Sequence, residues 1–145
     1  MREFEQVFKG LADQNRLRIL NLLLHGELCV CDIQYVLASS QPNVSRHLTY
    51  LKNAGLVLDR REGTRIYYRL ARAEGVRHRL FPFLRDAFRD SEELQEDARK
   101  LKNAVQTGAC TVNQWRPFSA LTAPKSASFN RYNENINRSA RRRRN

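Results

Sequence analysis

Two cysteines separated by a single residue have the most distinctive chemistry in this sequence. Cys29 and Cys31 lie in the stretch Leu28–Gln34, and the chain holds a third cysteine, Cys110. An odd number of cysteines, two of them this close, is a poor disulfide framework and is more typical of a metal or redox site in a reducing cytosol. From the spacing alone, two small buried apolar side chains are an equally good interpretation.

A helix is expected to begin near Cys29–Cys31, and its start would influence both thiols. The free N–H groups of a helix start stabilise negative charge and so favour the thiolate form. On a regular helix, residues i and i+2 point about 200° apart, so the two sulfurs cannot share an ion unless the first turn unwinds. This suggests a mechanism in which ion binding deforms the helix start and re-aims the segment that follows.

A second group of polar residues follows closely along the chain. Ser39–Pro42 predicts a turn into a helix, with Pro42 in the first helical turn, where no N–H is needed. Apolar residues at i, i+4 and i+7 from Val44 would face the core. Two short helices joined by this tight turn match the helix-turn-helix pattern, whose second helix reads DNA. The side chains expected to read DNA from its polar face are Gln41, Asn43, Ser45, Arg46 and His47. Arg46 can bond bidentately to guanine, whereas a contact with phosphate alone would position the protein without specifying the base.

Further elements are expected to hold these residues in place. Apolar spacing predicts a helix over residues 3–11 and a second helix from Asp13, its N-cap, to a stop at Gly26. Residues 56–70 predict a β-hairpin with its turn at Glu62–Gly63. The hairpin carries arginines that would contact phosphate or the minor groove: Arg60, Arg61 and Arg65. The predicted fold is therefore mainly α with a β-hairpin wing, a winged helix-turn-helix.

From Val76 onward the pattern predicts one long helix, which Pro82 starts or kinks. Apolar and small residues recur at alternating four- and three-residue steps, the seam of a helix that packs along another helix. The residues expected to form this seam are Leu80, Leu84, Ala87, Leu94, Ala98, Leu101 and Val105. Because a protomer of this size has little else against which to bury them, we predict a homodimer joined through its terminal helices.

Composition is consistent with one small domain and an anionic partner. The chain has 145 residues and a formal charge of +11, and residues 112–145 hold eight Lys and Arg side chains against the single acidic Glu134. We interpret residues 1–111 as the DNA-binding, sensor and dimerisation domain, and residues 112–145 as a basic, disordered tail. No signal peptide or apolar run of membrane-spanning length is present in the sequence, so we expect a soluble cytoplasmic protein that does not bind membranes.

Four segments in the right order resemble the ArsR family of winged-helix metalloregulatory repressors, and the resemblance covers residues 8–111. The segments are Leu11–Leu20, Glu27–Asp32, Gln41–Leu48 and Ala54–Val57. The Glu-Leu-Cys-Val-Cys-Asp box is similar to that of the arsenite/antimonite and cadmium/lead branches. The resemblance implies a homodimer that binds an inverted-repeat operator in double-stranded DNA and represses transcription. It also implies that As(III) or Sb(III), bound by cysteine thiolates, releases the operator, without an organic cofactor.

The sequence departs from the arsenite pattern at one position. Where that branch usually has a third cysteine, this chain has Gln34, a hard oxygen donor that suits a thiophilic ion poorly. Either the site is two-coordinate, or Cys110 supplies the third thiolate. The zinc site that other branches carry on the long helix is not expected, since His78 is the only histidine there.

Several alternatives remain open from the sequence. The same fold could respond to Cd(II) or Pb(II), to a monomethylated arsenical with two exchangeable positions, or to oxidants and persulfides through pairing of Cys110 with Cys29 or Cys31. From a different class, the basic tail would also suit a non-specific architectural DNA-binding protein. An enzyme is not expected: no histidine is placed to pair with a cysteine, and no Gly-rich phosphate loop or carboxylate pair occurs.

Overall fold

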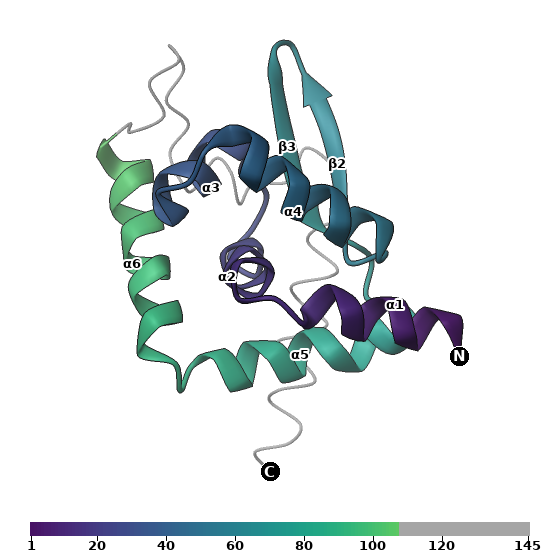
Figure 1. The fold of residues 1–145 in the computed structure, drawn as a ribbon. Helices are drawn as coiled ribbons and strands as arrows, with labels where there is room; N and C mark the ends of the chain where they lie inside the picture. Colours follow the sequence, from purple (N-terminus) through teal and green to yellow (C-terminus); the bar gives the residue numbers. More distant parts are fainter. Residues whose placement is uncertain (108–145) are drawn as a thin grey trace.

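The computed structural model describes residues 1–107, which form six helices and three short strands (Figure 1). In chain order these are α1 (Arg2–Leu11), α2 (Gln14–Leu23), β1 (Leu28–Cys29), α3 (Val30–Leu37), α4 (Gln41–Asn53), β2 (Val57–Glu62), β3 (Arg65–Leu70), α5 (Val76–Phe88) and α6 (Glu92–Thr107). The predicted tail and Cys110 lie outside the described residues. No helix among the described residues combines the length and apolar character that a membrane crossing requires.

The predicted helix starts are confirmed by their caps. The Asp13 carboxylate accepts a hydrogen bond from the backbone N–H of Arg16 (3.0 Å) at the start of α2. The Ser40 hydroxyl accepts one from the N–H of Asn43 (3.4 Å) at the start of α4, and Pro42 occupies the first turn. Each side chain satisfies a backbone donor that a helix start leaves without an intrahelical acceptor.

The core surrounds α2, which passes through the middle of the molecule with the other helices around it (Figure 1). Ile19, Leu20 and Leu22 of α2 are fully buried. The predicted apolar face of α4 is confirmed, because Val44, Leu48 and Leu51 are also fully buried in the same cluster. This packing holds the opposite, polar face of α4 at the surface.

The sheet has the strand order β1-β3-β2, and both pairings are antiparallel. The predicted hairpin is present, but its two-residue turn is Gly63–Thr64, since Glu62 pairs with Arg65. Gly63 has a φ of 62°, a conformation that glycine adopts without steric cost. The short strand β1 was not predicted, because two residues are too few to show a strand periodicity.

The prediction of one long helix after residue 76 is wrong. Pro82 lies inside α5 without ending it, whereas the chain turns at residues 89–91 and continues as α6 in a different direction (Figure 1). The hydroxyl of Ser91 accepts a hydrogen bond from the N–H of Leu94 (3.4 Å), so a capping serine between Ala87 and Leu94 of the predicted seam separates the two helices.

The predicted seam is largely buried within one protomer, because α6 packs against α2 and α3. Leu84, Leu101 and Val105 are 5%, 1% and 5% exposed and belong to the main core. Leu80 and Leu94 are half-buried and pack on that core, Ala98 is half-buried and Ala87 is exposed. Contrary to the prediction, the most buried of these residues, Leu84, Leu101 and Val105, do not need a second protomer for their burial.

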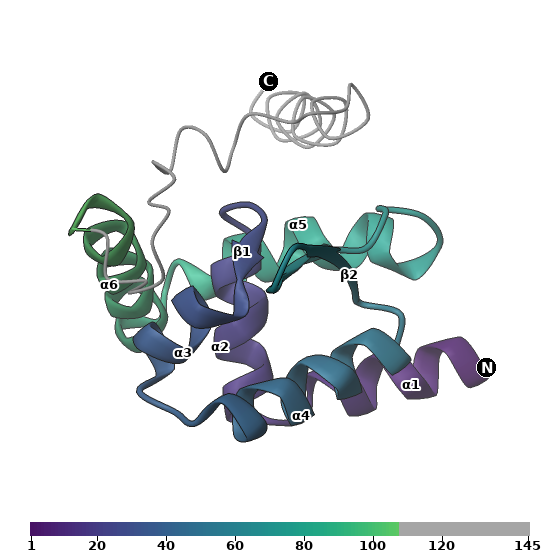
Figure 2. The ribbon, with the colours of Figure 1, turned by 90° about the horizontal axis from the view of Figure 1, so that it is seen from above.

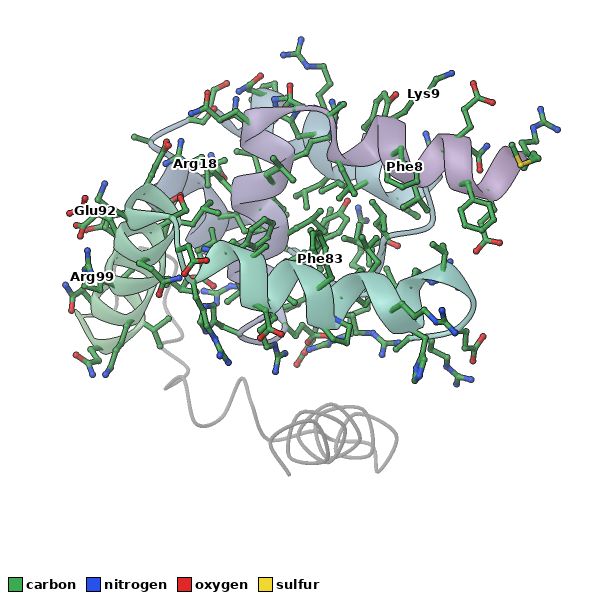
Figure 3. The ribbon with its side chains drawn as sticks, turned by 90° about the horizontal axis from the view of Figure 1, so that it is seen from below. Phe8, Lys9, Arg18, Phe83, Glu92 and Arg99 are labelled. Atoms are coloured by element: carbon green, nitrogen blue, oxygen red, sulfur yellow. The ribbon has the colours of Figure 1, made fainter. Side chains whose placement is uncertain are left out.

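A buried ion pair attaches α6 to α2. The Arg18 guanidinium donates two hydrogen bonds to Asp97, from Nε to Oδ2 (2.7 Å) and from Nη2 to Oδ1 (2.9 Å), and Asp97 is 1% exposed. Nearby, the Asn21 amide donates to the backbone carbonyl of Leu94 (2.8 Å). Figure 3 shows Arg18 beside α6.

Candidate thiol site and DNA-facing surface

Cys29 and Cys31 lie together at the start of α3, with their sulfur atoms 2.7 Å apart. The expectation that they point in opposite directions is wrong. Cys29 is the N-cap residue and has extended backbone angles (φ −71°, ψ 147°), so only Cys31 belongs to the helix. The helical rotation between i and i+2 does not apply across a cap, and the two sulfurs meet without any unwinding of α3.

The backbone of the first turn of α3 surrounds the Cys29 sulfur with donors. Cys29 and Asp32 form a capping box: the Asp32 N–H donates to the Cys29 side chain, and the Cys29 N–H donates to Asp32 Oδ2 (3.3 Å). The N–H of Cys31 also donates to the Cys29 sulfur. A sulfur in this position is prepared to carry negative charge.

Opposing influences act on the pKa of the Cys29 thiol. Burial raises the pKa of the Cys29 thiol, and the nearby Asp32 carboxylate raises it further, while the backbone donors and Arg65 lower it. Burial likewise raises the pKa of Asp32, which the Cys29 N–H and Arg65 counteract. A bound soft cation would take the place of the thiol proton and would be attracted by Asp32.

The described residues provide a two-sulfur site. Within residues 1–107, no group of three or more His, Cys, Asp and Glu side chains is arranged to hold a metal ion. Gln34 lies on α3, and the predicted third thiol, Cys110, is outside the described residues.

The thiol site is joined directly to the wing, a connection that no local sequence pattern predicts. Strand β1 runs straight into α3 (Figure 2), and its Cys29 pairs with Tyr67 of β3. One residue before β1, Glu27 accepts a hydrogen bond from Nε of Arg60 (2.8 Å). The Arg60 guanidinium also lies over the Tyr67 ring, 4.5 Å from its centroid. The only indication of this link in the sequence is the opposite charge of Glu27 and Arg60, which lie far apart in the chain.

The other connection from the thiol site is a tight turn into α4. Helix α3 ends at Ala38, which has a left-handed conformation (φ 49°, ψ 45°), and the Ser39 N–H donates to the Gln34 carbonyl (3.3 Å). The Ser39 hydroxyl in turn accepts from the Asn43 amide (2.8 Å). A displacement of α3 would therefore be transmitted to the first turn of α4.

Four of the five predicted α4 readers are accessible. Gln41 and Arg46 are exposed and Asn43 and Ser45 are half-buried. Arg46 is oriented by a hydrogen bond from its Nη2 to the Asn43 side-chain oxygen (2.7 Å).

The expectation that His47 lies on the exposed face of α4 is wrong. Its side chain is buried, and its Nδ1 is 3.6 Å from Asp13 Oδ1 at the start of α2. The alternation of polar residues on α4 could not reveal this, because the carboxylate that accommodates His47 comes from another helix.

The three wing arginines have different surroundings. Arg61 is exposed, Arg65 is half-buried near the thiol site, and Arg60 pairs with both Glu27 and Glu62. These two carboxylates raise the pKa of Arg60, and they balance its charge at the surface of the wing. Arg60 and Arg61 are both exposed on the wing, and the two carboxylate partners of Arg60 distinguish it from Arg61.

Three phenylalanines are exposed on α1 and α5. Phe4, Phe8 and Phe83 are 48%, 62% and 64% exposed, whereas Val7 of α1 is fully buried. Figure 3 looks onto the face that carries Phe8 and Phe83. Large aromatic side chains left together at a surface are typical of a protein-protein contact.

A helix pair joined by a tight turn and followed by a β-hairpin defines the molecule as a winged helix-turn-helix protein, a class that inserts its second helix into the DNA major groove. Residues 13–58 match the family described as "Bacterial regulatory protein, arsR family". The chain belongs to this ArsR family, and the resemblance drawn from its four segments is confirmed. The family consists of DNA-binding transcriptional regulators and is not a class of enzymes.

Named relatives support the assignment. The chain is 54% identical over 67 residues to the "Arsenical resistance operon repressor" of Escherichia coli strain K12, which is 46% of this chain and 57% of that protein. It is 41% identical over 99 residues to the "Arsenic resistance transcriptional regulator ArsR2" of Pseudomonas putida, 67% of this chain and 84% of that protein. The match thus spans little more than half the length of the first relative.

A solved structure supports the fold. The homodimeric winged helix-turn-helix domain of Mb0332 from Mycobacterium bovis, a possible ArsR-family regulator, superposes with a TM-score of 0.53 at 40% identity, covering 59% of this chain and 78% of that chain. The predicted fold class is confirmed by this neighbour.

Proposed function

We propose that this protein is a homodimeric transcriptional repressor that leaves its operator when As(III) or Sb(III) binds Cys29 and Cys31. The observation that carries the proposal is the adjacency of these two sulfurs, 2.7 Å apart, at a helix start that is linked to both DNA-facing elements. The printed functions of the two arsenic-resistance relatives support the choice of a metalloid.

The protein binds double-stranded DNA with α4 in the major groove. Gln41, Asn43, Ser45 and Arg46 are the side chains within reach of base edges, and Arg46 is the candidate for bidentate contact with guanine. Arg61 and Arg65 contact the backbone or the minor groove from the wing, and Arg60 stabilises the wing itself through its pairs with Glu27 and Glu62. A twofold dimer would recognise an inverted repeat.

The exposed phenylalanines of α1 and α5 supply the dimer contact. Phe4, Phe8 and Phe83 expose apolar surface that a second protomer would cover, in place of the seam that the protomer buries internally. The homodimeric state of the Mycobacterium bovis domain supports this arrangement.

The chemistry of release is thiol exchange at arsenic. Each cysteine thiol transfers its proton to a hydroxyl group of arsenous acid, which leaves as water while an As–S bond forms. Two such steps join Cys29 and Cys31 to one arsenic atom that keeps one hydroxyl group. Cys110 is our candidate to displace that last hydroxyl in the same way, as the third thiolate.

Ligand binding would then alter both connections of the site. An As–S bond would use one lone pair of the Cys29 sulfur, which would weaken its hydrogen bonds from the first α3 turn, and any shift of Cys29 would disturb its pairing with Tyr67. A shift of α3 reaches α4 through the short Ala38 turn, and a shift of β1 reaches the wing. The coupling free energy between arsenic binding and operator binding needs to be about 1–3 kcal/mol, which corresponds to a change of about 5- to 150-fold in operator affinity.

The test is operator-binding anisotropy with arsenite, antimonite, cadmium, lead and zinc added in turn to the parent and to Cys29→Ser, Cys31→Ser and Cys110→Ser. We expect arsenite and antimonite to weaken binding, and Cys29→Ser and Cys31→Ser to bind DNA normally but not respond. Serine is a favoured N-cap, so Cys29→Ser should retain the capped start of α3.

Three results would redirect or contradict the proposal. Tight operator binding with arsenic bonded to both sulfurs, confirmed by mass spectrometry, would contradict it. Release by polysulfide or peroxide without any ion, reversed by a reductant, would favour the thiol-redox alternative. Salt-sensitive binding without preference for any sequence would favour an architectural protein.

A further inference from the structure

A single arginine connects the helix that carries the exposed phenylalanines to the recognition helix. The side chain of Arg16, on α2, is only 12% exposed. Its Nε donates to the carbonyl of Gly10 (2.9 Å) and its Nη2 to the carbonyl of Lys9 (3.0 Å). These carbonyls belong to the last turn of α1, where a helix lacks intrahelical donors and carries partial negative charge.

The same guanidinium lies over the ring of Tyr50 on α4, 4.1 Å from the ring centroid. This distance is well within the range of a cation–π contact. Asp13, which caps α2, makes a second link between α2 and α4. Its carboxylate lies 3.9 Å from Nη1 of Arg16 on α2 and 3.6 Å from Nδ1 of His47 on α4. The junction of α1 and α2 is therefore attached to α4 at two neighbouring points.

Close packing keeps the end of α1 against the end of α4. A Cβ atom on Gly10 would lie 2.9 Å from Cδ1 of Leu56 and 3.1 Å from Cβ of Ala54, so a larger residue would force the two elements apart. Figures 1 and 2 both show α1 and α4 next to one another. Phe4 and Phe8 are exposed on this same α1.

We propose that Arg16 is a positioning residue that sets the spacing between the two recognition helices of the dimer, and hence the half-site spacing of the operator. This inference rests on the proposed dimer through α1 and α5 and on the proposed major-groove role of α4. A dimer reads two half-sites at a separation dictated by the distance between its recognition helices. Arg16 bonds to the end of α1, the helix that carries Phe4 and Phe8, and stacks on Tyr50 of α4.

A planar guanidinium is needed for this task. It donates in two directions within its plane to Lys9 and Gly10, while its face stacks on Tyr50. A lysine ammonium keeps the charge but has neither the fork of donors nor the flat face. Arg16→Lys should therefore retain the charge and lose the fixed angle between α1 and α4.

The experiment measures spacing preference with the full chain. A duplex is first selected from random-sequence DNA with the parent, and duplexes with its central spacer one base pair longer or shorter are then prepared. Affinity for all three is measured for the parent, Arg16→Lys, Tyr50→Leu and Tyr50→Phe. Arg99→Lys is the matched control, because Arg99 is an exposed α6 residue that pairs with Glu96.

We expect Arg16→Lys and Tyr50→Leu to lower the preference for the native spacing by about two- to fivefold, the value of a lost cation–π contact. Tyr50→Phe, which keeps the ring, and Arg99→Lys should match the parent. Loss of a DNA contact by Tyr50 would weaken binding to all three duplexes equally and leave their ratio unchanged, so the ratio reports positioning alone.

The outcomes separate this inference from the proposed function. An unchanged spacing ratio in both Arg16→Lys and Tyr50→Leu would overturn the positioning role, even if their thermal stability fell. If Arg16→Lys does not fold, Tyr50→Leu decides the result, because Tyr50 is exposed enough (42%) for its replacement to be tolerated. A parent that selects no duplex, or binds as a monomer, would overturn the proposed function itself.

Discussion

Cys29 acts both as the cap of α3 and as one half of the sulfur pair. Its backbone lies in β1 opposite Tyr67, and its side chain faces the donors of the first α3 turn. Its extended conformation brings its sulfur to that of Cys31. The buried carboxylate of Asp32 accepts the Cys29 N–H and adds negative charge beside the sulfurs. The same residues thus hold the helix start, tune the thiol and connect it to the wing.

Replacement of Asp32 by Asn tests this electrostatic role. Burial is the main cause that raises the pKa of the Cys29 thiol and Asp32 is a further one, so Asp32→Asn should lower that pKa. More thiolate is then present at any pH below the pKa, and iodoacetamide should alkylate Cys29 faster, with the pH–rate profile moved to lower pH.

The measurement uses Cys31→Ser Cys110→Ser protein, in which Cys29 is the only thiol. Asp86→Asn, an exposed α5 carboxylate, is the control and should leave the profile unchanged. A profile that moves to higher pH in Asp32→Asn would contradict the assigned effect of the carboxylate.

Helix α6 shows how an element is held by a few polar contacts as well as by its apolar side. Its acidic residue Asp97 is buried in the contact with α2 and accepts both hydrogen bonds of Arg18. The Leu94 carbonyl, near the start of α6, accepts from Asn21. These contacts fix α6 against α2, and α6 also packs against α3, so α6 belongs to the protomer core.

Removal of one member of this ion pair should be costly. Asp97→Ala leaves Arg18, whose side chain is 18% exposed, without its acceptor, and we expect a loss of about 3 kcal/mol in the free energy of unfolding. Urea denaturation followed by circular dichroism measures it. The double variant Arg18→Met Asp97→Leu should recover most of the loss, because no unpaired charge remains. A loss below about 0.5 kcal/mol for Asp97→Ala would show that the pair behaves as a surface contact.

The whole molecule presents two distinct surfaces. The wing lies at the opposite end of the molecule from α5 (Figure 1), and Phe8 of α1 and Phe83 of α5 are exposed on the face seen in Figure 3. Such an arrangement allows one surface to join protomers while the other contacts DNA. The dimer would place two copies of α4 on the same side.

Charge placed on the phenylalanine face should separate the protomers. Phe8→Glu and Phe83→Glu each put a carboxylate where we propose that the second protomer packs, and burial of an unpaired charge is strongly unfavourable. We expect analytical ultracentrifugation to give the mass of a dimer for the parent and of a monomer for both variants, with unchanged helical content.

Tyr35→Glu provides the control, because Tyr35 is 54% exposed on α3, away from this face. Dimers that persist in both phenylalanine variants would locate the interface elsewhere.

Much of the fold follows from local patterns. The caps Asp13 and Ser40 and the apolar spacing of Val44, Leu48 and Leu51 fall within single elements, so their energetic consequences can be read within a few residues. The two cysteines and the recognition helix could be identified from the sequence for the same reason, because residue types at short spacing indicate what each can bind.

The remaining features depend on residues far apart in the chain. The pairing of Cys29 with Tyr67, the Glu27–Arg60 link, the burial of His47 and the internal packing of α6 each require contacts that periodicity does not encode. A seven-residue repeat specifies which side of a helix is apolar but not which neighbour covers it. Here the sequence by itself determines the helices, the strands and the chemistry of their side chains, whereas tertiary packing determines which elements become neighbours. The reason is that the free energy of burial depends on the apolar area removed from water and not on the position in the chain of the residue that covers it.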